Sequence, residues 1–358
     1  MKRIRLAFLI SSLTAAGAEK QLVRTINILD KKKFKIKLFV LSDIDEIENE
    51  LNANIKVEYL KITNYFNPLN HFIVYYKLSN FKPHIVHSVM YASNMFSRFF
   101  KLIKSDTIII NHIHGLGSWI KNFHLLIDRF TLGLCDKIIV VSKKSFKLRL
   151  EREKYPLHKM SLVYNCIDTD IFKPNLCDHD KNIITIGVAA RLIPLKNIKY
   201  ALYLCKLLKK NKINFLLKIA GQGPEKTKLE NLAIKYGIQK EVEFLGLVND
   251  IQIFFNQIDF FLLTSYIEDL PLSIVEALSC GKKFIATDVG GIHELSLNTI
   301  SLLIGQKLNS ESELKFLDFI NENKSNFVVK KNRDFAVKTF NLQKHKSEIE
   351  NIYNQLLN

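Results

Sequence analysis

Short runs of apolar residues recur along the first half of the chain, and stretches with a helical period separate them. A short, nearly continuous apolar run is typical of a strand buried on both faces, and such strands belong to parallel sheets. The pattern therefore predicts a parallel sheet covered by helices on both faces. The predicted strands are residues 4–10, 36–41, 55–60, 85–88, 107–111 and 137–141.

The same alternation begins again after residue 182. Helical stretches at 198–209 and 224–236 separate the apolar runs of this second series. The predicted strands are residues 183–189, 215–220, 242–245, 259–264, 283–287 and 300–304. We therefore expect an α/β protein with two doubly wound domains and a cleft between them, in which ligands bind beyond the carboxyl ends of the strands.

The stretch between the two series has neither a strand period nor a helical period, and it contains Asn, Asp and Pro. We place the domains at residues 1–165 and 181–340, with a linker at 166–180. The last segment, 341–358, repeats its apolar residues on one helical face. We expect this helix to pack back on the first domain.

The composition is that of a globular protein with two cores: 358 residues, 47% apolar and 24% charged. Five scattered cysteines (Cys135, Cys166, Cys177, Cys205 and Cys280) include no CxxC pair. They predict neither a disulfide framework nor a zinc knuckle, and they favour a reducing cytoplasm.

The beginning of the chain allows two interpretations. Basic residues precede an apolar run, and Ala16 and Ala18 imitate the cleavage site of a signal peptide. The alternative is a first buried strand, which the cysteine pattern favours because it gives no sign of export. We find no other run of about eighteen apolar residues and expect no membrane span.

The net charge of +17 is concentrated in the first half of the chain. Such a charge suits nucleic acid, anionic lipid or phosphorylated substrates. We expect no nucleic-acid partner, because no RNP signature or helix-turn-helix pattern occurs. Residues 97–105 and 142–154 mix Lys and Arg with Phe and Leu, as helices at a membrane interface do, although core packing explains the apolar residues equally well.

Two loops of the first domain carry candidate residues. Gly17 follows the first strand, where a glycine lets the backbone approach a phosphate or sugar, although plain turn chemistry also explains it. No GxGxxG or GxxxxGK[ST] motif occurs. After the fifth strand come His112 and His114, followed by Gly115 and Gly117. If the strand continues, we expect the two histidines to point in opposite directions, so that at most one of them faces the cleft and they form no metal pair.

The loop after the first strand of the second domain carries Arg191 and Lys196, with Pro194 between them. Two cations at this spacing on a loop can converge on one dianion, because Arg offers a planar fork and Lys a mobile point charge. The alternative is that Arg191 and Lys196 are two solvated cations of the surface that bind no ligand. The loop after residue 264 carries Glu268, and Glu276 follows after seven intervening residues.

The sequence around the two glutamates predicts a helix that ends at Gly281. We expect Asp269 to cap this helix and Pro271 to lie in its first turn. Glu268 then lies in the loop, and Glu276 lies inside the helix. Unpaired N–H groups near Leu270 to Ser273, Leu272 among them, suit phosphate or hydroxyl oxygens.

The chain resembles the retaining glycosyltransferases of the GT-B fold, specifically family 4 (glycosyl transferases group 1). The matching segments extend through nearly the whole chain, and the most specific is the last of them. They are "AGAEKQL", "HIHGLGSW", "DKIIVVS", "YNCIDTDIF", "AARLIPLKN", "IAGQGPEKTKLENLA", "VEFLGLV" and "SYIEDLPLSIVEALSCGKKFIATDVGGIHEL". The resemblance implies two Rossmann-like doubly wound domains, with the acceptor bound by the first and the donor by the second.

The resemblance also implies residue roles. Arg191 and Lys196 would bind the donor diphosphate, Glu276 the ribose, and Glu268 the transferred sugar. His114 would lie at the reacting centre and Gly17 beside the pyrophosphate. Residues 269 to 272, which are Asp269, Leu270, Pro271 and Leu272, would complete the donor site.

A hexosyltransferase of this family implies a UDP- or GDP-sugar donor, a glycan or lipid-linked acceptor and no other cofactor. It implies metal independence, retention by front-face attack, and a role in bacterial polysaccharide biosynthesis at the cytoplasmic membrane. This chain departs from the family pattern at Asp269 and Cys166, where glycine is usual, so the donor sugar stays open. The alternative is a GT-B protein that acts on a nucleotide sugar as an epimerase or hydrolase.

Overall fold

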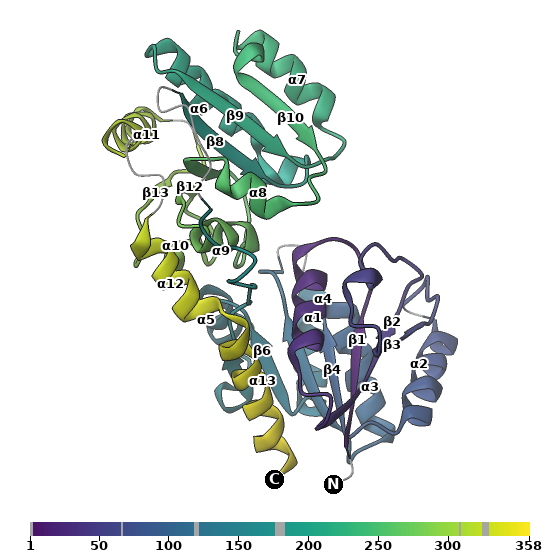
Figure 1. Ribbon diagram of the computed structural model, residues 1–358. Helices are drawn as coiled ribbons and strands as arrows, with labels where there is room; N and C mark the ends of the chain where they lie inside the picture. The colour runs from purple at the N-terminus through teal and green to yellow at the C-terminus, as the bar shows by residue number, and fades with distance from the viewer. Residues whose placement is uncertain (1–2, 66, 118–121, 176–182, 308, 324–328) are drawn as a thin grey trace. The chain divides into compact units, whose positions relative to one another are not determined.

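The computed structural model describes residues 3–65, 67–117, 122–175, 183–307, 309–323 and 329–358 (Figure 1). The chain divides into two compact units. Unit 1 comprises Met1–Cys166 and Leu342–Asn358, and unit 2 comprises Ile167–Asn341. Cys177, residues 118–119 of the histidine loop and residues 176–180 of the expected linker lie outside the described residues.

Unit 1 is built around a parallel sheet with the strand order β3-β2-β1-β4-β5-β6-β7. The strands are β1 (Ile4–Ile10), β2 (Phe34–Val40), β3 (Lys56–Tyr59), β4 (Ile85–Val89), β5 (Ile108–Ile113), β6 (Lys137–Val140) and β7 (Met160–Leu162). The helices are α1 (Gly17–Ile28), α2 (Pro68–Phe81), α3 (Tyr91–Ile103), α4 (Asn122–Thr131), α5 (Lys143–Glu151) and α13 (Leu342–Leu357).

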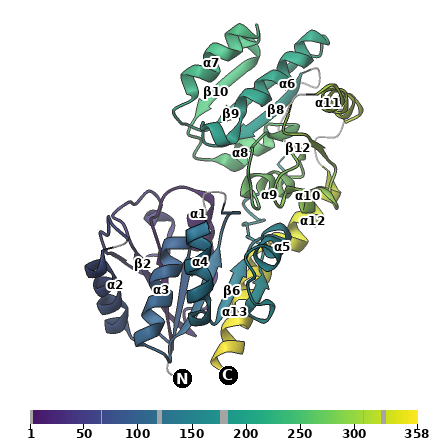
Figure 2. The ribbon, with the colours of Figure 1, turned by 180° about the vertical axis from the view of Figure 1, so that it is seen from behind.

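Alternate residues of β1 enter two different cores, as the pleat of a strand requires. Leu6, Phe8 and Ile10 pack with α1 and α13, which is the yellow helix in Figure 1. Ala7 and Leu9 pack with α2 and α3 on the opposite face of the sheet (Figure 2). The apolar run at the beginning of the chain is therefore an interior strand of a sheet, between β2 and β4, and the strand interpretation is confirmed.

Unit 2 repeats this architecture with the strand order β10-β9-β8-β11-β12-β13, again parallel. The strands are β8 (Ile184–Ala189), β9 (Phe215–Ala220), β10 (Val242–Gly246), β11 (Phe260–Leu263), β12 (Lys283–Thr287) and β13 (Ser301–Ile304). The helices are α6 (Ile198–Lys210), α7 (Lys226–Lys235), α8 (Ile251–Asn256), α9 (Leu272–Ser279), α10 (Ile292–Ser296), α11 (Ser310–Glu322) and α12 (Lys330–Phe340).

The core of unit 2 also lies on both faces of its sheet. Phe260 and Leu262 join the large cluster formed with α6, α7 and α11. Phe261, which lies between them on β11, packs instead on Phe255 of α8, with ring centroids 5.5 Å apart. The α/β class with two doubly wound units is confirmed. None of the described helices is long and apolar enough to cross a bilayer.

The structure contains one strand that the pattern did not predict. β7, Met160–Leu162, has three residues and pairs with β6 at the edge of the sheet. Its residues, Met, Ser and Leu, form no apolar run long enough to recognise. The short edge strand is therefore a feature of tertiary pairing rather than of local sequence.

Candidate functional site

In each unit the strand order reverses next to the first strand, between β1 and β4 and between β8 and β11. The connections leave these neighbouring strands in opposite directions, which opens a crevice at their carboxyl ends. In unit 2 the loop after β8 carries Arg191 and Lys196, and the loop after β11 carries Glu268. The candidate residues of this unit therefore lie at its topological switch point.

Lys196 and Glu268 are in direct contact. The Lys196 Nζ lies 2.5 Å from Oε1 of Glu268, and both side chains are largely buried. The hydroxyl of Ser265 donates to the same carboxylate oxygen at 2.7 Å. The structure thus brings together two residues that lie 72 positions apart in the sequence, and a hydroxyl holds the carboxylate in place.

Backbone hydrogen bonds join the two loops as well. The N–H of Tyr266 donates to the carbonyl of Leu195 at 2.9 Å. The hydroxyl of Thr264 donates to the carbonyl of Asn197 at 2.9 Å. Asn197 has a left-handed backbone with φ 50° and leads directly into α6. The two loops are therefore joined by main-chain hydrogen bonds as well as by the contact between Lys196 and Glu268.

Two glycines of the loop after β9 lie close against the backbone of the Arg191 loop. A Cβ on Gly221 would lie 1.9 Å from the carbonyl oxygen of Ala190, and one on Gly223 would lie 2.4 Å from that of Leu192. Both glycines have φ values near 150°, which other residues rarely adopt. Neither glycine was predicted to have a role, although the GQG pattern after a predicted strand was the available signal.

Arg191 itself is exposed. Among the described residues no acidic side chain pairs with it. Lys196 differs, because Glu268 already contacts its ammonium group. The site therefore presents one open guanidinium group and one ammonium group held by a carboxylate.

The expected cap of α9 is wrong. The N-cap position is Pro271 and the first helical residue is Leu272, so Asp269 lies two residues before the cap. The structure places Asp269 and Leu270 in the buried turn instead, where the carbonyl of Asp269 accepts the N–H of Gly291 at 2.7 Å. Pro271 takes the cap position because its extended backbone, with ψ 118°, leads the chain into the helix.

Pro271 was also expected in the first turn and is instead the cap, but the interior and the end of α9 are as predicted. Glu276 lies inside the helix and is half-buried. The helix ends at Ser279, and Gly281 follows with φ 73°, the left-handed conformation that glycine adopts at helix ends. The first helical turn begins two residues later than expected, at Leu272. No side chain caps its N–H groups.

In unit 1 the two histidines after the fifth strand lie together, contrary to the expectation of opposite directions. The expectation is wrong because residues two positions apart in an extended strand share a face, and His112 lies on β5 with His114 just beyond its end. The rings of His112 and His114 have centroids 4.4 Å apart. Gly115 follows with φ 92°, and its carbonyl accepts a hydrogen bond from Arg149 at 3.0 Å.

His114 lines a small cavity of about 50 Å³ at the carboxyl end of β5. The residues around it include Arg98, Asp128, Arg149 and Tyr155. Burial lowers the pKa of His114 to about 3, with a smaller contribution from His345. The imidazole is therefore neutral at pH 7 and can accept or donate a hydrogen bond.

A buried ion pair forms one wall of this cavity. Arg98 and Asp128 are 1% and 3% exposed, and their nearest atoms are 2.6 Å apart. Arg98 also donates to Asn111 of β5 at 2.6 Å, and Tyr155 donates to Asp128 at 2.7 Å. The network joins α3, α4 and β5 beneath the histidine loop. The sequence gave no signal that Arg98 and Asp128 pair, because they are single charged residues far apart in the chain.

Gly17 begins α1 and is exposed at the carboxyl end of β1. Glu19 lies in the first turn of the same helix and accepts a hydrogen bond from Thr14 at 3.0 Å. Gly17 is not among the glycines with positive φ. The helix N-terminus is thus placed at the switch point of unit 1.

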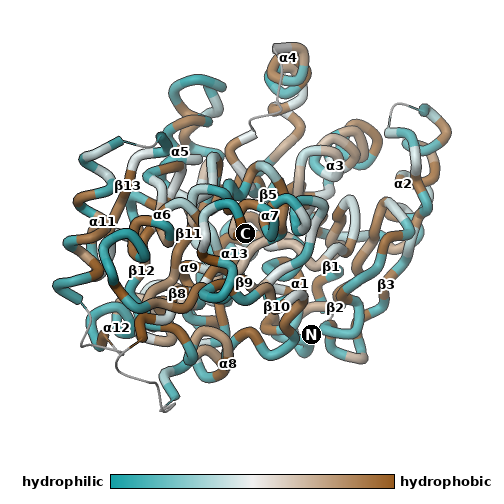
Figure 3. Tube along the Cα trace, turned by 90° about the horizontal axis from the view of Figure 1, so that it is seen from above, coloured by the Kyte–Doolittle hydropathy of each residue, from teal (hydrophilic) through white to brown (hydrophobic). Residues whose placement is uncertain are grey.

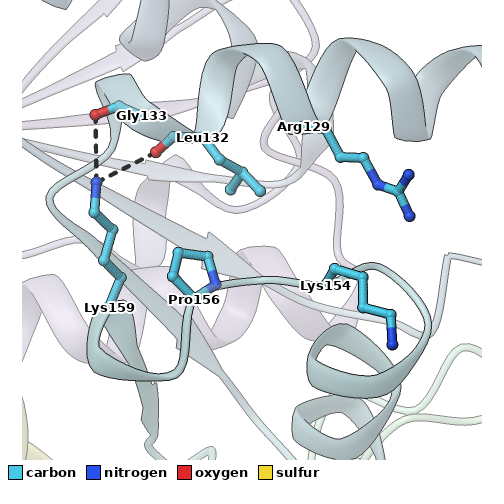
Figure 4. Close-up of a pocket in the computed structure, with 6 residues that line it drawn as sticks. All are labelled: Arg129, Leu132, Gly133, Lys154, Pro156 and Lys159. Carbon is cyan, nitrogen blue, oxygen red and sulfur yellow. Dashed lines mark hydrogen bonds between the residues drawn. The ribbon is translucent and has the colours of Figure 1, made fainter.

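Figure 4 shows a second pocket of unit 1, with a volume of about 710 Å³. Leu132 and Pro156 contribute apolar surface, and three cations line it. Lys159 donates to the carbonyls of Leu132, Gly133 and Cys135, the last at 2.6 Å. Among the described residues Arg129 and Lys154 have no acidic partner. The pocket therefore presents two available cations.

Exposed apolar side chains lie next to two residues that line this pocket. Phe130, which follows Arg129 on α4, is 80% exposed, and Leu157 follows the lining residue Pro156. Brown segments mark apolar residues on α3 and α4 in Figure 3. Residues 97–105 contribute Leu102 and Ile103 to the exposed set. The apolar residues of 142–154 instead pack inward, so core packing explains that segment.

The described residues contain no group of three His, Cys, Asp or Glu side chains placed to hold a metal ion. The cysteines among them, Cys135, Cys166, Cys205 and Cys280, are buried and form no disulfide with one another.

Two family models match the chain: Glycosyltransferase Family 4 over residues 15–171 and Glycosyl transferases group 1 over residues 168–337. A phosphatidylinositol N-acetylglucosaminyltransferase protein of Arabidopsis thaliana is 31% identical over 173 residues, which is 47% of this chain and 38% of that protein. The chain thus spans well under two thirds of the length of this relative.

Other similarities extend over the whole chain. An Escherichia coli UDP-Gal:alpha-D-GlcNAc-diphosphoundecaprenol alpha-1,3-galactosyltransferase is 21% identical over 98% of this chain and 97% of its own length. The crystal structure of HepE of Anabaena in complex with UDP matches with a TM-score of 0.81 and 17% identity, over 98% of this chain and 100% of that one. The two family models together match residues 15–337 and show that the chain belongs to the family 4, group 1 glycosyltransferases, while the structural similarity shows the GT-B fold.

Proposed function

We propose that this protein is a retaining hexosyltransferase that moves a sugar from a UDP- or GDP-sugar to a hydroxyl of a glycan or lipid-linked acceptor. The proposal extends to a role in bacterial surface polysaccharide biosynthesis. The observation that carries it is the contact between Lys196 and Glu268 at the switch point of unit 2, beside the open guanidinium of Arg191. This is the place where an open α/β sheet binds its ligand.

The charges suit a nucleotide diphosphate sugar. Arg191 and Lys196 would bind the diphosphate, whose charge would compete with Glu268 for the Lys196 ammonium group. The carboxylate of Glu268 then has an oxygen available for the hydroxyls of the transferred sugar, while Ser265 keeps it in place. Glu276 on α9 would accept the ribose hydroxyls, and the N–H groups of the first turn of α9 would face phosphate oxygens.

We propose that the reaction is independent of a metal ion and retains the anomeric configuration. Support for metal independence is the pair of cations, Arg191 and Lys196, which can supply the positive charge that the leaving diphosphate requires. For retention we propose front-face attack, in which the leaving phosphate accepts the acceptor's proton. His114 and Gly17 would lie near the donor, with His114 neutral as a hydrogen-bonding residue.

The functions of two relatives support the proposed donor and acceptor. The E. coli relative uses UDP-galactose and a diphosphoundecaprenol-linked acceptor. Another E. coli relative, 26% identical over 62% of the chain, is an O-antigen biosynthesis glycosyltransferase. We therefore take UDP-sugars and GlcNAc-diphosphoundecaprenol as the first probes for this protein.

We expect transfer of a hexose from a UDP- or GDP-sugar to GlcNAc-diphosphoundecaprenol or to a related lipid-linked glycan, with the donor's anomeric configuration kept in the product. The product is isolated and its anomeric proton is read by NMR, with and without EDTA. Inversion would contradict the mechanism, and loss of activity in EDTA would contradict metal independence. Free sugar or an epimerised nucleotide formed without acceptor would instead support a hydrolase or epimerase.

We also propose that unit 1 docks on an anionic membrane at the inner leaflet of the cytoplasmic membrane, using the surface around the pocket of Figure 4. Arg129 and Lys154 would bind lipid phosphates, and the exposed Phe130 and Leu157 would enter the interface. Apolar side chains flanked by cations are the pattern of proteins that lie on anionic bilayers.

Charge reversal at the pocket, Arg129→Glu with Lys154→Glu, is expected to weaken binding to phosphatidylglycerol vesicles by a factor of about thirty or more, since each cation near the surface contributes roughly 1 kcal/mol. Vesicle flotation at low and high salt measures this. Lys235→Glu with Lys240→Glu makes the same charge change on exposed residues of unit 2 and is the control. Equal binding by both double variants, or no flotation of the unsubstituted protein, would overturn the docking proposal.

A further inference from the structure

Three buried side chains form a hydrogen-bonded chain that leads from the C-terminal helix to the histidine loop of unit 1. The hydroxyl of Tyr353 on α13 lies 2.6 Å from Nδ1 of His87 on β4. The Nε2 of His87 lies 3.2 Å from Nδ1 of His112 on β5. Tyr353, His87 and His112 are 0%, 1% and 3% exposed. All three residues belong to unit 1, and none of them is a candidate donor-binding residue of unit 2.

The direction of these hydrogen bonds follows from the acidity of the groups. A phenol is a stronger acid than a neutral imidazole, so the Tyr353 hydroxyl donates to Nδ1 of His87. His87 then carries its proton on Nε2 and donates it to Nδ1 of His112. His112 must in turn carry its proton on Nε2, which is buried and has no hydrogen-bond partner among the described residues.

All members of the chain are neutral at pH 7. Burial lowers the pKa of His87 to about 3 and that of His112 well below its usual value. Burial also raises the pKa of Tyr353 well above 10. A neutral imidazole has two tautomers, and here the tyrosine hydroxyl selects one of them in each ring.

The chain ends against the face of His114. The rings of His112 and His114 are 4.4 Å apart with planes inclined by 36°. Arg149 holds the next residue, Gly115, through its carbonyl. The His112 ring therefore packs against one side of the His114 ring, and Arg149 holds the backbone that follows it. His114 itself lines the cavity at the end of β5.

We propose that Tyr353 is a positioning residue for His114, acting through the fixed tautomers and ring planes of His87 and His112. The inference rests on the proposed function in one respect, because that function puts His114 at the reacting centre. In this arrangement the last helix of the chain, which follows the whole of unit 2 in the sequence, sets the orientation of a side chain at the carboxyl end of a unit 1 strand.

The substitution Tyr353→Phe separates this role from core packing. The ring of Tyr353 packs in the core with Phe34, at 5.6 Å between centroids, and phenylalanine keeps that contact. Only the hydroxyl is lost, which leaves Nδ1 of His87 without a donor. His87 can then populate both tautomers, and the constraint on His112 and His114 is released.

The test uses the full chain labelled with 15N-histidine, with the His114→Gln variant to assign the His114 signals. In the unsubstituted protein we expect His87 and His112 to show only the tautomer protonated on Nε2. In Tyr353→Phe we expect mixed tautomers at both and shifted nitrogen signals at His114. Tyr59→Phe is the control, because it also removes one tyrosine hydrogen bond of unit 1, the 2.7 Å bond to Glu48. We expect it to leave all three histidines unchanged.

A kinetic measurement with a UDP-sugar donor completes the test. Tyr353→Phe is expected to lower kcat roughly tenfold with an unchanged donor KM, because a misplaced group at the reacting centre affects the transition state more than binding. Unchanged His112 and His114 signals in Tyr353→Phe would overturn the positioning role, whatever the activity. If the protein transfers no sugar, the proposed function fails while the NMR result still decides whether the hydroxyl controls the histidines.

Discussion

Replacing Arg191 or Lys196 by alanine is expected to leave a folded protein whose sugar transfer falls by roughly a hundredfold or more, because each fixed donor at such a site contributes about 3 to 4 kcal/mol to the barrier. The diphosphate gains negative charge as the glycosidic bond breaks, so these cations bind the transition state more strongly than the ground state. Initial rates with a UDP-sugar donor measure the effect.

The two substitutions differ in their structural setting. Arg191 is exposed, so its loss leaves no buried group without a partner. Lys196 contacts Glu268, but the hydroxyl of Ser265 still holds that carboxylate in the alanine variant. Lys210→Ala removes an exposed cation at the last residue of α6, the helix that follows the Lys196 loop, and serves as the control. Unchanged turnover in either folded site variant would contradict the role of the pair.

Removing the carboxylate of Asp128 is expected to be the most destabilising single change in unit 1. Asp128→Ala leaves the Arg98 guanidinium buried without its ionic partner, and this should lower the free energy of unfolding by about 3 to 5 kcal/mol. It also removes the acceptor of the Tyr155 hydroxyl. Differential scanning calorimetry should show the unfolding temperature of unit 1 lowered by roughly 10 °C.

Two further variants show whether the buried charge is the cause. Glu151→Ala breaks the exposed ion pair with Lys147. The Lys147 side chain is 69% exposed and that of Glu151 is 63% exposed, so the substitution should lower the free energy of unfolding by less than about 0.5 kcal/mol. Arg98→Met combined with Asp128→Leu removes both charges and should be more stable than Asp128→Ala alone. An unfolding temperature for Asp128→Ala equal to that of Glu151→Ala would contradict this explanation.

The sheets could be predicted from the sequence because a buried parallel strand needs an apolar run, and the runs at 215–220 and 283–287 coincide with β9 and β12. The position of Glu276 inside a helix that ends before Gly281 could be predicted for a similar local reason. Neither depends on which strands become neighbours.

The features that could not be predicted depend on the tertiary structure. The contact of Lys196 with Glu268 requires β8 and β11 to be adjacent. The contact of His112 with His114 is different, because residues two positions apart in a strand share a face, so the expectation of opposite directions was wrong on local grounds. The pairing of Arg98 with Asp128 joins two helices through single residues. The cap of α9 was predicted wrongly because Asp269 is a good capping residue, whereas tertiary contacts bury it in the preceding turn.

The central claim is that Arg191 and Lys196 bind the diphosphate of a nucleotide sugar, while Glu268 and Glu276 bind the sugars on either side of it. A crystal structure of the protein with a UDP- or GDP-sugar tests it most directly. We expect phosphate oxygens at hydrogen-bond distance, about 3 Å, from both cations, with ribose hydroxyls on Glu276 and hexose hydroxyls on Glu268. A nucleotide sugar bound elsewhere, or bound here with these four side chains turned away from it, would contradict the account.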